Sequence, residues 1–200
     1  MLVPRLRLKN WQLCLGNVVL IILLWDAQAT GLRWGLIEPI RSEKLLLVLT
    51  LFVGIAGLLP SALPARFSAS QTTAIARDAN LLLILYQLIY MMAPRVLIAA
   101  YPLTSVAGAG IIFSLLGVVM MYMPRNGVIG IRIPSTAASP VIWHKTNVLG
   151  GRLFFLLGIV ILLSAGLLGD TWGLIVMGVG TVIMAAVTVF YAHHLSKMAH

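Results

Sequence analysis

Few side chains in this sequence could do chemistry, and their spacing does not suit catalysis. His193 and His194 are adjacent, so on a helix they would point in different directions and could not chelate one metal ion. His144 has no Cys, Asp or Glu nearby in sequence, and the single cysteine, Cys14, has no CxxC partner. No nucleophile elbow, zinc-protease, dinucleotide-binding or P-loop motif occurs. We therefore expect no enzyme, no metal site and no cofactor.

Polar side chains inside apolar segments form a second group of candidates. Arg95 follows Pro94 in an apolar run, where two interpretations are open. The helix kinks at Pro94 and the guanidinium reaches the interface, or the arginine is buried and binds a ligand carboxylate. Gln87 and Asn17 either form hydrogen bonds between helices or line a substrate site. Gln87 and Arg95 are the candidate intramembrane polar site.

The composition sets the class of protein that carries these residues. The chain has 200 residues, of which 60% are hydrophobic and 10% are charged, whereas soluble chains are about 25% charged. The formal net charge of +9 would suggest nucleic-acid binding in a soluble protein. In a membrane protein, basic loops set the orientation instead. The composition therefore predicts a polytopic membrane protein that binds no nucleic acid directly.

Six apolar segments separated mostly by Pro and Gly predict an all-α protein, a six-helix transmembrane bundle in one domain over residues 1–200. The expected spans are 11–29, 45–63, 79–101, 103–123, 151–169 and 172–192. A long loop, residues 124–150, joins the fourth span to the fifth, and we call it the motif loop. Arg5 to Lys9, an apolar run and Ala27-Gln28-Ala29 also resemble a cleavable signal peptide, but we expect the first helix to be retained.

Basic residues set the expected orientation of the bundle. One set of alternate segments carries a single acid, Asp78, and ten basic residues. These basic residues are Arg5, Arg7, Lys9, Arg66, Arg77, Arg125, Arg132, Lys145, Arg152 and Lys197. The other set balances four basic residues with four acids: Arg33, Arg41, Lys44 and Arg95 with Asp26, Glu38, Glu43 and Asp170. Both termini and the motif loop are therefore expected in the cytoplasm, and the lipid bilayer is the first expected partner.

The motif loop is long and has residues that shape a backbone. Ser139 before Pro140 is typical of a helix start, which predicts a short helix over 140–148 and a hinge at Gly150-Gly151. Trp143 is expected as an anchor in the membrane interface. The basic residues of the loop suit either anionic lipid headgroups or a docking protein, and both interpretations stay open.

The order of residues in the motif loop resembles the SdpI family of bacterial toxin-immunity membrane proteins. The matching positions are Asn126, Gly130, Ile131, Arg132, Pro134, Thr136, Trp143 and Lys145. Ile133 and Ser135 depart from the family's usual Thr and Trp. The family's plan of six spans agrees with the six apolar segments.

This resemblance implies a function for the chain. It implies a multi-pass protein of the bacterial plasma membrane that gives resistance to a secreted peptide toxin on its outer face. It also implies that a cytoplasmic winged-helix repressor is sequestered at the membrane, which is a form of signal transduction. Arg132, Trp143 and Lys145 would then form the patch that meets the repressor or the membrane.

Two other classes of function remain open. One is a small transporter or channel subunit with its path near Gln87 and Arg95. The other is an assembly partner without a small ligand. The small-residue pairs Ser105/Ala109 and Gly110/Ser114 permit close helix packing, within the chain or in an oligomer.

Overall fold

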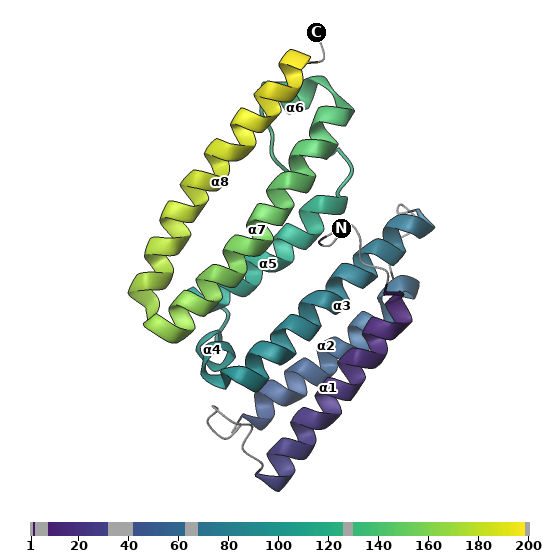
Figure 1. The fold of residues 1–200 in the computed structure, drawn as a ribbon, viewed down its shortest axis with the longest axis vertical. Helices are drawn as coiled ribbons and strands as arrows, with labels where there is room; N and C mark the ends of the chain where they lie inside the picture. Colours follow the sequence, from purple (N-terminus) through teal and green to yellow (C-terminus); the bar gives the residue numbers. More distant parts are fainter. Residues whose placement is uncertain (1, 3–7, 32–41, 63–67, 126–129, 199–200) are drawn as a thin grey trace. The chain divides into compact units, whose positions relative to one another are not determined.

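A computed structural model describes most of the chain. The described residues are 2, 8–31, 42–62, 68–125 and 130–198, with residues 59–62 as backbone only. These residues form helices, turns and short irregular segments, with no strand among them, so the prediction of an all-helical protein is confirmed. The chain divides into two compact units, Leu2–Ile98 and Ala99–His200, and each is described by itself (Figure 1).

The first unit consists mainly of three long helices, α1 (Asn10–Thr30), α2 (Glu43–Ala62) and α3 (Ala69–Met92). Each of the three packs against the other two (Figure 1). The Trp25 indole N–H donates to the Thr50 hydroxyl at 3.0 Å and so joins α1 to α2. The expected spans 11–29 and 45–63 agree closely with α1 and α2.

The third expected span, 79–101, is wrong at both ends. Ser68 begins α3 ten residues earlier, because its hydroxyl accepts from the Gln71 N–H while the Gln71 side chain accepts from the Ser68 N–H. The helix ends at Met92, since Ala93 leaves the helical conformation and Pro94 begins the short helix α4 (Pro94–Ala99). The apolar run is therefore split at Ala93.

The second unit contains α5 (Val106–Tyr122), the short α6 (Pro134–Ala138), α7 (Pro140–Leu168) and α8 (Asp170–Met198). Figure 1 shows α7 with α5 and α8 along its length, and α6 contacts its first turns. The expected fifth span, 151–169, covers only the second part of α7, which is one continuous helix of 29 residues. The expected hinge at Gly150-Gly151 is wrong, because both glycines lie within this helix.

Glycines set the distance between α5 and α7. A Cβ on Gly110 would lie 2.6 Å from the Gly158 carbonyl oxygen, and one on Gly151 would lie 2.6 Å from the Gly117 carbonyl oxygen. Only glycine leaves room for two backbones this close. The rings of Phe113 and Phe154 stack in the same interface, with centroids 5.1 Å apart. The expected close packing at Gly110 and Ser114 is therefore formed against α7.

The described helices include several that suit a membrane. Four of them are long and apolar enough to cross it, namely α1, α3, α7 and α8, and α5 is a shorter apolar helix. Large apolar side chains are exposed along α8, among them Val182 at 70% and Phe190 at 75%. A bilayer is the solvent that favours such a surface. The chain is therefore a helical protein with the properties of a membrane protein.

Candidate functional site: the motif loop on α7

After Arg125, the described part of the motif loop resumes at Gly130, which lies directly over α7. Its φ of 131° is in the region that favours glycine. A Cβ at this position would lie 2.7 Å from the Asn147 carboxamide oxygen and 2.7 Å from the Trp143 ring. Both the backbone conformation and the space therefore require glycine, which explains physically why this motif position is Gly.

Asn147 fastens the segment after Gly130 to the helix. Its carboxamide oxygen accepts from the Ile131 N–H at 2.8 Å, while its carboxamide nitrogen donates to the Trp143 carbonyl at 2.9 Å. The side chain is buried, with 2% of its surface exposed. The Ile131 side chain covers Gly150, where a Cβ would lie 2.3 Å from the Ile131 Cδ1. The loop and the first turns of α7 are thus one packed layer.

Thr136 shapes the turn that follows. Its hydroxyl accepts from the Ile133 N–H at 3.0 Å and donates to the carbonyl of Ile131 at 2.9 Å or that of Ile133 at 3.0 Å. Pro134 occupies the first helical position of α6, where its missing N–H costs no hydrogen bond. The Arg125 guanidinium donates to the Ala137 carbonyl and holds α6 from the side of α5.

The layer leaves basic side chains at its surface. Arg132, His144 and Lys145 are exposed, whereas Trp143 is buried with 5% of its surface exposed. The expectation that Trp143 is an interface anchor is wrong, because its ring packs beneath Gly130. The predicted patch of Arg132, Trp143 and Lys145 therefore reduces to two exposed cations, with the tryptophan as part of their support. Asn126 lies outside the described residues.

The other predicted site residues, Gln87 and Arg95, lie in different surroundings. Gln87 is fully buried in α3, and its carboxamide nitrogen donates to the Asn17 side-chain oxygen at 2.5 Å. Arg95 is exposed in α4, beyond the break at Ala93. Gln87 and Arg95 therefore do not form one pocket among the described residues.

Asn17 and Gln87 belong to a chain of four carboxamides between α1 and α3. Asn17 donates to the Asn80 side-chain oxygen at 2.9 Å, and Asn80 donates to the Asn10 side-chain oxygen at 3.2 Å. Asn10 and Asn17 are seven residues apart on α1, and Asn80 and Gln87 are seven apart on α3. This shared spacing keeps the four side chains in one interface of two helices that run in the same direction.

Three features of the motif loop were missed by the sequence analysis. Asn147 was not predicted as a site residue, although its spacing of four residues from Trp143 places both on one face of a helix. Gly150 was interpreted as a hinge, whereas the Ile131 side chain packs on it. Two buried polar atoms, Trp143 Nε1 and Thr146 Oγ1, have no hydrogen-bond partner among the described residues.

Comparison with known proteins finds one family whose pattern includes the motif loop. Residues 122–192 match the SdpI/YfhL protein family, and this match confirms the resemblance of the motif loop to that family. The matched segment begins at the end of α5 and takes in the motif loop, α7 and most of α8. No curated protein and no solved structure matches the chain.

Proposed function

We propose that this chain is an integral membrane immunity protein that gives its cell resistance to a secreted peptide toxin. The single observation that carries the proposal is the match of residues 122–192 to the SdpI/YfhL family. The geometry supports it, because Gly130 and Trp143, two of the motif positions, are in direct steric contact. These two residues of the family pattern thus pack the motif loop against α7 in this chain.

The proposed topology has six spans in the bacterial plasma membrane. They are formed by the long helices α1, α2, α3, α5, α7 and α8, while α4 and α6 lie at helix ends. Both termini and the motif loop face the cytoplasm, as the distribution of basic residues favours. In this arrangement the junction of α7 and α8 at Gly169 faces outward, on the side of the toxin.

The proposed working surface on the cytoplasmic side is formed by Arg132 and Lys145. Both side chains are exposed. Arg132 follows the segment that Gly130 and Asn147 hold against α7, and Lys145 is carried by α7 itself. Exposed cations suit an acidic surface on a partner protein. Sequestration of a winged-helix repressor would use this pair, and Trp143 would act only by supporting it.

The experiment that tests the immunity proposal is a dose–survival curve. A bacterium sensitive to an SDP-type peptide toxin is given the chain or an empty vector and is challenged with increasing toxin. We expect survival at concentrations that kill the vector control, with the chain confirmed in the membrane fraction. Equal killing of both strains at confirmed membrane expression would contradict immunity to this toxin class.

A small transporter or channel subunit is the alternative function. The observation that favours it is the buried Gln87 side-chain oxygen, which has no hydrogen-bond partner in the described part of the chain. A hydrogen-bond donor of a substrate could bind to this side-chain oxygen. This alternative predicts saturable uptake or efflux that is lost in Gln87→Leu or Arg95→Ala, whereas the immunity proposal predicts protection that depends on the identity of the toxin.

A further inference from the structure

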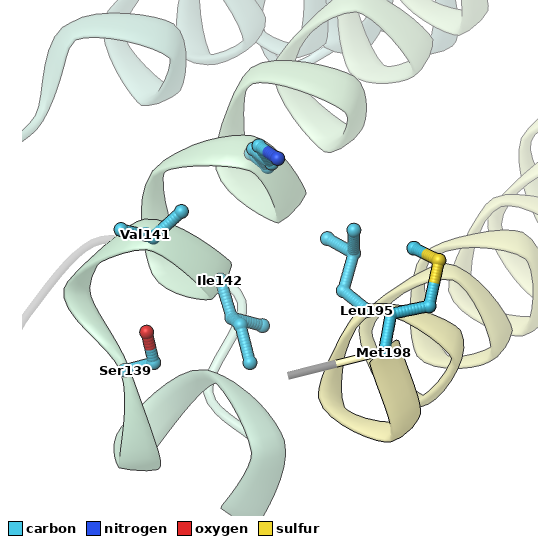
Figure 2. Close-up of a pocket in the computed structure, with 6 residues that line it drawn as sticks. Ser139, Val141, Ile142, Leu195 and Met198 are labelled. Atoms are coloured by element: carbon cyan, nitrogen blue, oxygen red, sulfur yellow. The ribbon is translucent and has the colours of Figure 1, made fainter. Parts of the chain in front are cut away.

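A pocket lies between the beginning of α7 and the end of α8, within the second unit. It has a volume of about 340 Å³ and is lined by Ser139, Val141, Ile142, Lys145, Leu195 and Met198. Figure 2 shows Ile142 on one side of this space and Leu195 and Met198 on the other. The walls are thus mostly apolar, and Lys145 supplies the one formal charge of the lining.

Part of the pocket lining lies away from the segment at Gly130 and Ile131 that packs over α7. Successive residues of a helix are rotated by about 100°, which places Trp143 and Asn147 near one face of α7. Lys145 and Val141 fall on the opposite face. Gly130 and Ile131 therefore cover the face of α7 that carries Trp143 and Asn147, whereas Val141 and Lys145 line the pocket from the opposite face.

In the proposed six-span topology, with Gly169 at the outer edge of the hydrocarbon, the length of the two helices puts the pocket at headgroup depth. α7 and α8 each have 29 residues and meet at Gly169, whereas about 20 residues cross the hydrocarbon of a bilayer. Counted from Gly169, Lys145 lies about four residues beyond such a span, or about 6 Å at the helical rise. This is the depth at which lipid phosphates lie.

The formally charged side chains at the start of α7 and the end of α8, Lys145 and Lys197, are both basic. His144, His193, His194 and Lys197 are exposed on the same ends of α7 and α8. The only acid after residue 78 is Asp170, which begins α8 at its other end. A ligand here would therefore gain from a negative charge beside Lys145.

We propose that this pocket binds an anionic phospholipid of the surrounding bilayer, with the lipid phosphate at Lys145 and the glycerol and upper acyl carbons between Ile142 and Leu195. Val141 and Met198 expose 61% and 64% of their surfaces, so the apolar walls open toward the membrane rather than closing around a small ion. An acidic protein helix could meet the same charge. The depth of the pocket favours the lipid, which is present there at high concentration.

The test uses the full chain purified in detergent and native mass spectrometry of the lipid that it retains, with dioleoyl phosphatidylglycerol or dioleoyl phosphatidylcholine added. We expect retention of phosphatidylglycerol over phosphatidylcholine. Lys145→Gln is expected to weaken that retention about fivefold, and Leu195→Gln is expected to weaken it as well. Lys197→Gln removes the same charge nearby from a residue outside the lining and should leave retention close to that of the unchanged chain.

Several results would overturn the proposal. Equal retention of the two lipids would show that the pocket does not select the anionic one. An equal loss of phosphatidylglycerol retention in Lys197→Gln and Lys145→Gln would indicate a general attraction of the lipid to the basic ends of α7 and α8. Displacement of the lipid by millimolar inorganic phosphate would indicate a site for the anion alone. Blocking of the pocket by an acidic helical peptide, with no retained lipid, would favour a protein partner. None of these measurements uses a toxin, so they are independent of the immunity proposal.

Discussion

The side-chain oxygen of Asn147 accepts a hydrogen bond from the backbone N–H of Ile131 at 2.8 Å, and this bond joins the motif loop to α7. The two residues are 16 positions apart, and the intervening chain turns back through α6. Because the same carboxamide also donates to the Trp143 carbonyl, its orientation is fixed from both sides. Arg132 is the next residue along the loop, so its position depends on this contact together with the hydrogen bonds of the Thr136 hydroxyl to Ile131 and Ile133.

Asn147→Leu should release the loop from the helix. The change leaves the Ile131 N–H without its acceptor, which costs about 1–3 kcal/mol for a buried group. Thermal unfolding in detergent and tryptic cleavage after the exposed Arg132 would measure the two effects, a lower Tm and faster cleavage. The matched control is Thr181→Ala, whose hydroxyl bonds only its own helix in the described structure. Unchanged cleavage in Asn147→Leu would show that the contact does not hold the loop.

Gly130→Ala should disturb the same loop by a different route. The new Cβ would enter the space of the Trp143 ring, at a φ that an L side chain rarely adopts. We expect faster cleavage after Arg132 and a changed tryptophan emission. Gly178→Ala is the control, since nothing lies within 4 Å of its Cβ position. Equal behaviour of the two variants would contradict the close contact of Gly130 with α7.

Gly117→Ala should separate α5 from α7. Its Cβ would lie 2.4 Å from the Phe155 backbone nitrogen, an atom that cannot move aside without the helix. Overpacking of this kind costs about 1–3 kcal/mol. The measurement is the Tm in detergent, with Gly54→Ala on α2 as a control in open space. A variant as stable as this control would mean that the helices are less close than described.

The carboxamide chain between α1 and α3 predicts non-additive stability. Asn17→Leu and Gln87→Leu each remove one partner of the same hydrogen bond, so the double variant should lose less than the sum of the two. We expect a coupling free energy of about 0.6–2 kcal/mol, as for other hydrogen bonds between membrane helices. Asn17→Leu combined with Thr181→Ala should be additive. Additivity in the first pair would contradict the contact.

Local patterns predicted more of this structure than long-range contacts could. Apolar length placed α1, α2, α5 and α8 within a few residues of their expected bounds, apart from a longer end of α8. The start of α3 was readable too, because Ser68 and Gln71 have the spacing of a capping box. The prediction placed the start at residue 79 instead, because the continuous apolar run begins there.

The errors in the motif loop have a different cause. Trp143 is exposed or buried according to whether another segment covers it, and the segment that does so lies 13 residues earlier at Gly130. Gly150-Gly151 is compatible with a hinge in isolation. Packing of Ile131 on one glycine and of α5 on the other makes both of them helical. A single sequence contains no local sign of either contact.

The central claim is that the motif loop presents Arg132 and Lys145 as the working surface of an immunity protein. The most direct test compares the toxin concentration that halves survival in cells carrying the unchanged chain, Arg132→Ala/Lys145→Ala, or Lys44→Ala as an exposed cation elsewhere. At equal membrane levels, we expect protection by the unchanged chain and by Lys44→Ala, and its loss in the double variant. Full protection by the double variant would contradict the claim.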